Sequence, residues 1–262
     1  MMERLTIVKV GGAVVEDTAR LGGLLDRFAA IGGKKILVHG GGRAATEMAT
    51  RLGMETKMVD GRRITDKDTL QVATMVYAGL VNKNIVAALQ ARKTNAVGLT
   101  GADMGLILGA KRAPKDDVDY GYVGDIRRVD ATRMARLLDK DAAVPVIAPL
   151  THDGAGTLLN TNADSIAASV AKAMCRLYDV TLIYCFEKPG VLADPENDAS
   201  VIRRIDRAVF ERLKADGTVA GGMLPKIENA LESVENGVGS VVITQAENIG
   251  DNAAGTEIVK EA

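Results

Sequence analysis

The chain lacks tryptophan, has only two cysteines in 262 residues, and draws 3% of its residues from the aromatic types. Cys175 and Cys185 lie in apolar stretches, which suits reduced thiols in a reducing compartment better than a disulfide framework or a metal site. The low aromatic content argues against an aromatic-rich β-sandwich and favours layers of Val, Ile, Leu and Ala. We therefore expect a cytoplasmic protein of the α/β class.

The sequence also lacks an excess of charge and a long hydrophobic run. Its 33 basic and 34 acidic residues leave a formal net charge of -1, so no basic surplus is available to bind nucleic acid or an anionic membrane. The first ten residues have no apolar core of the signal-peptide type, and no run of about 18 apolar residues could cross a bilayer. We expect neither a nucleic-acid nor a membrane partner.

Short β-branched runs alternate with segments of helical periodicity. The runs cover residues 5–10, 35–39, 96–99, 144–148, 180–184 and 241–244. The helical spacing between most of them indicates crossover connections in a parallel sheet with helices on both faces. A long helix is predicted after residues 65–68, interpreted as a capping box, and further helices from Ala163 and around Ile227. Residues 112–125 and 194–200 are predicted to be polar loops, the first a loop or a hairpin.

Glycine turns end the first two predicted strands. Lys9-Val10-Gly11-Gly12 ends the first, and His39-Gly40-Gly41-Gly42 ends the second. Glycine lets backbone N–H groups approach an anion closely, and the N-terminus of the following helix adds about half a positive charge. Glycine also occurs in ordinary strand-to-helix turns, but two such turns with a lysine beside one favour a shared anion site. Neither turn matches a P-loop.

The second turn has an alternative interpretation. Gly40-x-Gly42-x-x-Ala45 fits the loose dinucleotide-binding fingerprint, with Asp60 at a suitable distance to meet a ribose. A dinucleotide-binding oxidoreductase is therefore one alternative. The preceding histidine and the position after the second predicted strand count against it.

Three polar motifs follow along the chain. Arg62 and Arg63 precede the long predicted helix, and a guanidinium there suits a substrate carboxylate because it offers two parallel hydrogen bonds. In the run from Asn160 to Asp164, an Asx turn and an N-cap leave Asn160 without a structural role. Lys226 opens a helix, where a cation gains nothing from the helix dipole unless an anion shares the site. Solvated surface side chains are the alternative for the arginines and for Lys226.

In this order the motifs resemble the amino-acid kinase family and, within it, the kinases of N-acyl glutamates. The likeness covers nearly the whole chain and rests on residues 9–12, 39–42, 61–65, 82–83, 160–164 and 222–226. It implies a three-layer αβα sandwich around a mainly parallel sheet, formed by a single domain of residues 1–262. It also implies an acylglutamate-binding N-terminal lobe of about residues 1–176 and an ATP-binding C-terminal lobe of about residues 177–262.

The resemblance further implies the reaction and its residues. The reaction is ATP-dependent phosphorylation of the γ-carboxylate of N-acetyl-L-glutamate in arginine biosynthesis, with Mg²⁺ bound through the nucleotide and no separate metal site. Lys9 and Lys226 match the two clamps on the phosphoryl group, and Asp164 matches the aspartate that holds them. The substrate-binding positions are Gly41, Gly42, Arg63 and Asn160. The nucleotide-binding positions are Gly11, Gly12, Gly190 and Gly222, with Gly11, Gly41 and Gly42 supplying N–H donors.

Some features depart from the family pattern. Residues 186–190, Phe-Glu-Lys-Pro-Gly, stand where an Asp-Val pair before a glycine is common, and Glu187 is the candidate to replace the aspartate. The loop at residues 98–103 lacks a basic residue often found there. Arginine-inhibited relatives carry an additional N-terminal helix, whereas the first strand here begins within a few residues of Met1, so a homodimer without arginine feedback is expected. The alternatives are the same reaction on N-succinyl-L-glutamate, another activity of the family, and a non-catalytic metabolite sensor.

Overall fold

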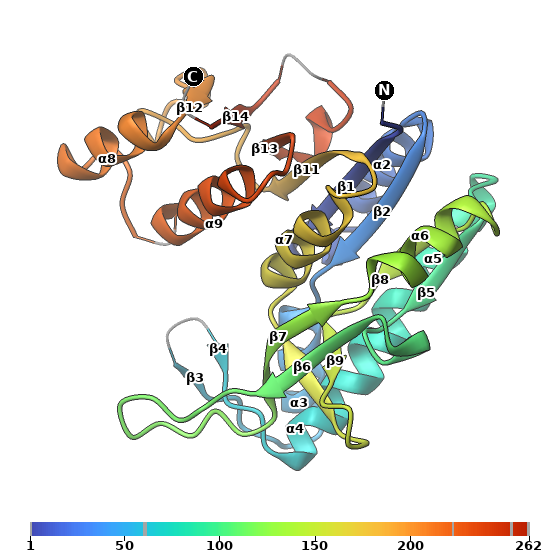
Figure 1. The fold of residues 1–262 in the computed structure, drawn as a ribbon. Coiled ribbons are helices and arrows are strands. Elements are labelled where there is room, and N and C mark those ends of the chain that lie inside the picture. The colour runs from blue at the N-terminus through green and yellow to red at the C-terminus, as the bar shows by residue number, and fades with distance from the viewer. Residues whose placement is uncertain (1, 60–61, 222, 252–253, 261–262) are drawn as a thin grey trace.

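A computed structural model describes residues 2–59, 62–221, 223–251 and 254–260. Its centre is an eight-stranded sheet in the order β12-β14-β13-β11-β1-β2-β8-β5 (Figure 1). The pairs from β13 to β5 are parallel, and β14 pairs antiparallel with β13. The strands are β1 (Arg4–Val10), β2 (Lys34–His39), β5 (Ala96–Leu99), β8 (Val144–Ile147), β11 (Asp179–Phe186), β12 (Arg204–Ile205), β13 (Ser240–Gln245) and β14 (Thr256–Ile258). All six predicted runs are confirmed as strands.

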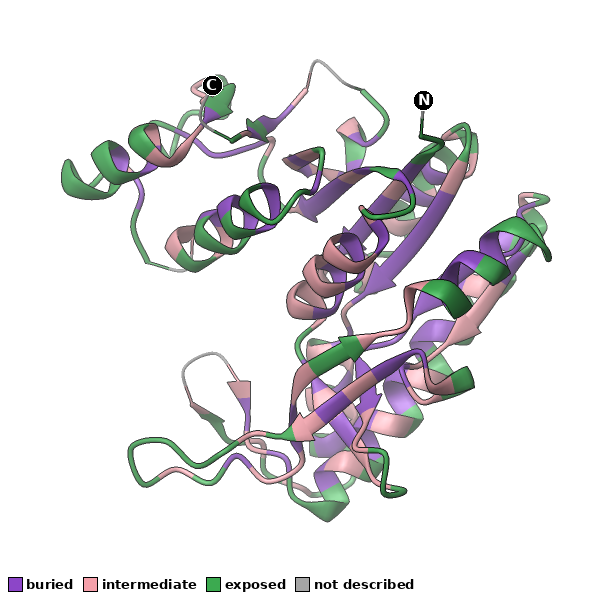
Figure 2. Cartoon of the chain, viewed as in Figure 1, coloured by how far each residue is buried: buried purple, intermediate pink, exposed green. Residues whose placement is uncertain are grey.

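Helices cover both faces of this sheet, which confirms the predicted αβα sandwich. In β1, Leu5 and Ile7 join a buried cluster with α6 to α9, whereas Val8 and Val10 join a second cluster with α1 to α5. The sheet separates two cores because successive side chains of a strand point to opposite faces, and Figure 2 shows its central strands buried. The helices are α1 (Gly12–Glu16), α2 (Thr18–Ala30), α3 (Gly42–Arg51), α4 (Lys67–Thr74), α5 (Asn82–Ala91), α6 (Ala131–Asp139), α7 (Ala163–Met174), α8 (Arg207–Ala215) and α9 (Met223–Glu235).

The long helix predicted after residue 65 is present, but its cap is not the predicted one. The side chain of Asp66 accepts a hydrogen bond from the N–H of Thr69 at 2.8 Å. Thr65 is the wrong cap because its hydroxyl donates to the carbonyl of Arg63 and its backbone is bonded to Tyr120 and Tyr122. These extended backbone bonds fix Thr65 before the helix begins.

This helix runs from Lys67 to Ala91 and changes its geometry in the middle. Between α4 and α5 lies a π-helical segment, η1 (Met75–Val81), a distortion that is common at functional sites. By length and composition Lys67–Ala91 is also a helix that could cross a membrane, although 44% of its most apolar window is buried inside the protein. The core helix of a globular protein has these properties too.

A small second sheet, which the sequence did not predict in full, lies beside the main one. It contains β6 (Ile107–Lys111), β7 (Val123–Val129), β9 (Leu150–His152) and β10 (Leu158–Thr161), in the closed order β10-β7-β6-β9. The loop or hairpin predicted at residues 112–125 is confirmed, because most of this range connects the antiparallel strands β6 and β7. A further hairpin pairs β3 (Met58–Val59) with β4 (Arg62–Arg63), and short 3-10 turns occupy η2 (Asp103–Gly105) and η3 (Ala246–Asn248).

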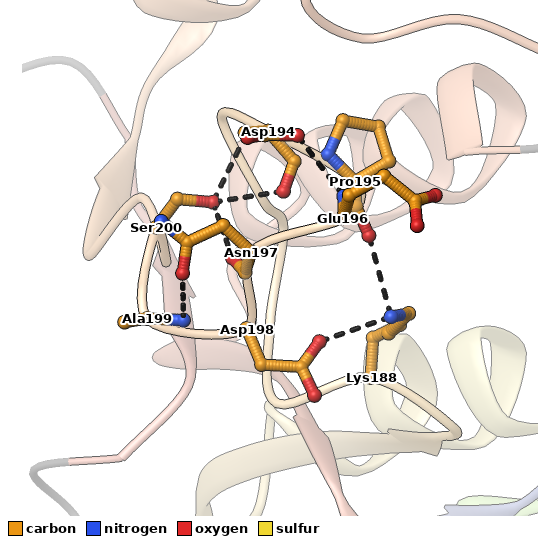
Figure 3. A network of polar contacts seen from close by, with 8 residues as sticks. All are labelled: Lys188, Asp194, Pro195, Glu196, Asn197, Asp198, Ala199 and Ser200. Carbon is orange, nitrogen blue, oxygen red and sulfur yellow. Dashed lines mark hydrogen bonds and ion pairs between the residues drawn. The ribbon is translucent and has the colours of Figure 1, made fainter.

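The polar loop predicted at residues 194–200 is confirmed and is held by its own hydrogen bonds (Figure 3). The Ser200 hydroxyl accepts from the N–H of Asp194 and donates to its carbonyl, both at 3.0 Å. Lys188 forms an ion pair with Asp198 at 2.9 Å. The loop is therefore tied to the segment that follows β11.

Candidate active site

Two lysines from distant parts of the chain meet at the carboxyl edge of the main sheet. Lys9, near the end of β1, is 6% exposed, and its Nζ lies 2.7 Å from Oδ1 of Asp164, in the first turn of α7. Lys226 lies in the first turn of α9. The ammonium groups of both lysines lie over the ring of Phe186, at 5.1 Å for Lys9 and 4.0 Å for Lys226 from the centroid. The structure thus brings the three predicted catalytic residues together, and their roles stay predictions.

The two lysines share one carboxylate. Burial lowers the pKa of the Lys226 ammonium below its usual 10.5, Asp164 opposes this shift, and the charge of Lys9 adds to it. Oδ1 of Asp164 contacts the Lys9 ammonium at 2.7 Å and has no further partner among the described residues. This trio carries a surplus positive charge, which a phosphate group would neutralise.

The two glycine turns lie face to face beside the lysines, as predicted. A Cβ atom placed on Gly12 would lie 3.9 Å from the nitrogen of Gly42 and 4.0 Å from that of Gly41. Gly41 is the N-cap and Gly42 the first residue of α3, so their N–H groups have no acceptor within the helix. Gly11 differs, because its N–H donates to the carbonyl of Cys185 at 3.3 Å. The Gly11 N–H is thus already bonded within the protein, and its donor role toward a bound anion stays a prediction.

A pocket of about 180 Å³ opens beside the second glycine turn. Its lining includes all four residues predicted to bind substrate, Gly41, Gly42, Arg63 and Asn160. Asn162 and Ala163, immediately before Asp164, also line it, so the pocket adjoins the lysine pair. The sequence thus predicted correctly that these residues lie together, although substrate binding itself stays a prediction.

Arg63 is fixed rigidly in the pocket wall. Its Nη1 donates to the Thr56 hydroxyl at 3.0 Å, and its Nη2 donates to the Gly42 carbonyl and the Thr46 hydroxyl, each at 2.7 Å. The side chain is 8% exposed. These bonds tie β4 to the first turns of α3, so Arg63 also positions the glycine turn. No local sequence pattern indicates this second role.

Asn160 enters the pocket from the small second sheet. Its Nδ2 donates to the hydroxyl of Thr65 at 3.0 Å, and its backbone N–H donates to the carbonyl of Tyr122 at 2.8 Å. The amide is therefore oriented by β-sheet contacts outside the run 160–164. This support accounts for the position of a residue that the Asx turn alone left unexplained.

A buried histidine supports the second glycine turn from behind. His39 Nδ1 lies 2.7 Å from the Gly40 carbonyl, and this nitrogen must carry the proton because a carbonyl only accepts. Its Nε2 then accepts from Nδ2 of Asn82 at 3.1 Å, and Asn82 also donates to the Val146 carbonyl at 2.9 Å. Burial lowers the pKa of His39 to about 4. The neutral ring therefore fixes the orientation of the Gly40 peptide.

Tyr77 in the π-helical segment packs directly against Gly41. A Cβ atom on Gly41 would lie 2.9 Å from Cδ1 of that ring, so glycine is required for close packing. Burial raises the pKa of the Tyr77 hydroxyl. The ring also lines the pocket, so the change in helix geometry places an aromatic wall at the site.

The remaining predicted nucleotide-side positions have different outcomes. Gly222 and Asp60 lie outside the described residues. A Cβ atom on Gly190 would lie 2.7 Å from Cγ1 of Val201, so this glycine allows the segment after β11 to pack closely. Glu187 forms an exposed ion pair with Arg43 of α3 at 3.4 Å. Within the described ranges, no group of three or more His, Cys, Asp and Glu side chains is arranged to hold a metal ion.

Comparisons with known proteins cover nearly the whole chain. A model described as the amino acid kinase family matches residues 4–245. A Bacteroides thetaiotaomicron protein named acetylglutamate kinase is 61% identical over 260 residues, which are 99% of this chain and 100% of that protein. A Bacteroides fragilis protein (strain ATCC 25285) of the same name is 58% identical over 260 residues, 99% of this chain and 98% of that protein. The crystal structure of smu.665 from Streptococcus mutans UA159 superposes with a TM-score of 0.79 at 26% identity, covering 97% of this chain and 98% of that one.

Proposed function

The chain belongs to the amino acid kinase family, and from this premise we propose that it transfers the γ-phosphoryl group of ATP to the γ-carboxylate of N-acetyl-L-glutamate, in arginine biosynthesis. The observation that carries the proposal is the meeting of Lys9 and Lys226 with Asp164 beside the pocket. The substrate is supported by relatives named acetylglutamate kinase, 61% and 58% identical over 260 residues.

The chemistry requires positive charge more than a base. A γ-carboxylate has a pKa of about 4.3 and is ionised at neutral pH, so no proton needs to be removed. One carboxylate oxygen forms a bond to the γ-phosphorus while the bond from that phosphorus to the bridging oxygen breaks, and ADP leaves with the electron pair. The barrier arises from the approach of two anions, which positioning and electrostatic stabilisation lower.

Each predicted residue has a physical role in this transfer. Lys9 and Lys226 stabilise the charge that spreads over the migrating phosphoryl group and the leaving oxygen, and the N–H groups of Gly41 and Gly42 donate to phosphoryl oxygens. Asp164 orients the lysines, beginning with Lys9, whose ammonium lies 2.7 Å from its Oδ1. Arg63 and Asn160 bind the α-carboxylate.

In this proposal the nucleotide and the substrate bind to different lobes. Residues of about 1–176 hold the acylglutamate and residues of about 177–262 hold ATP, with Gly12, Gly190 and Gly222 beside the nucleotide. Mg²⁺ accompanies ATP through its phosphate oxygens, where it neutralises phosphate charge.

We further propose a cytoplasmic homodimer that needs neither nucleic acid nor a membrane. Two free cysteines suit a reducing compartment. β5 is an edge strand of the main sheet, and Met75 and Leu80 are exposed on the helix that ends before it. An unpaired edge beside exposed apolar side chains favours self-association. Light scattering of the purified protein measures the mass directly, and a monomer at working concentrations would contradict the proposal.

The test of the function is an ADP-release assay with one candidate acceptor at a time. N-acetyl-L-glutamate, glutamate, aspartate and UMP are each supplied with MgATP, and acyl phosphate is trapped with hydroxylamine. We expect ADP and hydroxamate with the acylglutamate and neither product with glutamate, aspartate or UMP. Binding of ATP without turnover of any acceptor would favour a non-catalytic metabolite sensor. The oxidoreductase alternative has no support among the relatives described above.

A further inference from the structure

Arg62 is a cation in the pocket wall whose side chain has no partner among the residues that the structure describes. It lies on β4 beside Arg63 and lines the pocket, and it is partly buried. The Arg63 side chain makes three hydrogen bonds to protein groups, whereas the Arg62 side chain makes no hydrogen bond or ion pair in the part of the chain that the structure describes. A guanidinium carries five donors, and none of those of Arg62 is used by another described residue, so they are available to a ligand in the pocket that Arg62 lines.

The charges around Arg62 do not compensate it. Asp125 is the acid whose charge acts on Arg62, but its carboxylate is already paired with Arg112. The guanidinium of Arg112 lies over the ring of Tyr120, 5.7 Å from the centroid, and its Nε is buried without a hydrogen-bond partner. Burial lowers the pKa of Arg62, and the like charge of Arg112 lowers it further. Two guanidinium groups thus share one carboxylate, an arrangement that a bound anion stabilises.

The proposed reaction already assigns the two carboxylates of a glutamate. The γ-carboxylate faces the lysines and the α-carboxylate faces Arg63 and Asn160, so only the acyl group is left to meet Arg62. An acetyl group ends in a methyl, which offers this guanidinium no acceptor. An acyl chain that ends in a carboxylate offers two oxygens, which match the parallel donors of an arginine.

We propose that Arg62 binds a carboxylate at the end of the acyl group, so that the pocket takes N-acyl glutamates with a dicarboxylic acyl chain at a higher kcat/KM than N-acetyl-L-glutamate. This inference rests on the proposed function and concerns the acyl end of the same pocket. Arg62 is then a residue that determines specificity, because it contacts a part of the substrate that does not react.

The test compares N-succinyl-L-glutamate with N-acetyl-L-glutamate in wild type, Arg62→Met, Arg62→Lys and Arg128→Met. Charge-assisted paired hydrogen bonds are worth about 10-fold or more in affinity. We therefore expect wild type to favour the succinyl substrate by about 10-fold and Arg62→Met to lose that preference through KM. Arg62→Lys should keep part of it. Arg128 is exposed on β7, so Arg128→Met should change neither substrate.

Other outcomes would overturn the inference. Thermal unfolding of Arg62→Met is compared with wild type to separate a folding defect from a loss of binding. Calorimetric titration of both acyl glutamates measures binding without turnover. An equal loss for both substrates, a rise in the KM for ATP alone, or a wild type that favours the acetyl substrate would contradict a carboxylate-binding role. Turnover of the acetyl substrate alone would leave the proposed function standing without this inference. Turnover of neither substrate would contradict both the proposed function and this inference.

Discussion

The ammonium groups of Lys9 and Lys226 lie over one aromatic ring, 5.1 and 4.0 Å from the centroid of Phe186. The first lysine belongs to the first strand of the chain and the second to its last long helix, and the ring comes from the end of β11. A ring face attracts cations, so Phe186 holds two like charges close together before any phosphate arrives. The positive site is therefore built into the folded protein.

Removal of either ammonium should act mainly on the chemical step. We expect Lys9→Met and Lys226→Met each to lower kcat by about 100-fold or more, with smaller changes in KM, because the positive charge is needed most in the transition state. Steady-state kinetics measures this. Lys172→Met is the matched control, since Lys172 pairs with Glu232 on the protein surface. Near-normal turnover in either site variant would contradict the clamp assignment.

The alkaline limb of the pH profile should reflect Lys226. Its pKa is lowered from 10.5, mainly by burial, so the ammonium loses its proton at a lower pH than a free lysine does. As the pH is raised, kcat/KM should therefore begin to decrease before pH 10.5 is reached. Asp164 raises this pKa, and Asp164→Asn should move the limb to still lower pH in addition to reducing the rate. The measurement is kcat/KM against pH, which reports on the free enzyme. A limb at the same pH in both proteins would show that another group controls it.

Arg63→Ala should affect both substrate binding and stability. The KM for the acylglutamate should rise, because the α-carboxylate loses a charged partner, while that for ATP should stay nearly unchanged. The free energy of unfolding should fall by about 2 kcal/mol, because the Gly42 carbonyl and the hydroxyls of Thr46 and Thr56 lose a charged donor. Kinetics and denaturant unfolding measure the two effects separately. A rise in the KM for ATP alone would place the guanidinium at the nucleotide.

His39 should make the protein sensitive to mild acid. Its pKa is about 4 in the folded protein against 6.5 for the free side chain, so the unfolded chain binds more protons between these values. The free energy of unfolding should therefore decrease as the pH falls through this window, by about 2 kcal/mol between pH 7 and pH 5. Urea unfolding at the two pH values measures the change. His39→Gln should lose this component, and His152→Asn, at the other of the two histidines, should retain it.

Local sequence patterns predicted the frame of the fold well. Hydrophobic runs located six strands of the main sheet, and the signal was clearest in β1, β2, β8 and β11, where most residues are buried. Helical periodicity located α7 and α9. The cap at Thr65 was predicted wrongly because extended backbone pairing with Tyr120 and Tyr122 fixes that residue, which no local pattern shows. β9 and β10 were missed because each is short and includes polar residues, Leu-Thr-His and Leu-Leu-Asn-Thr, so neither forms an apolar run.

The candidate site could be assembled from glycines and charged residues, but the groups that support them could not. The order of the motifs predicted that Lys9, Asp164 and Lys226 lie in one site, and it also predicted the substrate-binding residues that line the pocket. In the sequence, Phe186 belongs only to a segment that departs from the family pattern. Its position under both lysines depends on packing between distant elements. The contact between His39 and Asn82 at 3.1 Å likewise joins residues far apart in the chain, and periodicity carries no information about it.

The π-helical segment Met75–Val81 has a consequence for the helix beyond it. A π hydrogen bond spans five residues where an α hydrogen bond spans four, so this segment holds a residue that a regular α-helix would not accommodate. Deletion of one residue there would restore regular winding and rotate everything beyond it by about 100° around the axis. Asn82, the first residue of α5, would then turn away from His39. The additional residue sets the rotational orientation of α5 about its axis. Its deletion would misalign the side chains of α5 with the sheet and leave the helical content nearly unchanged.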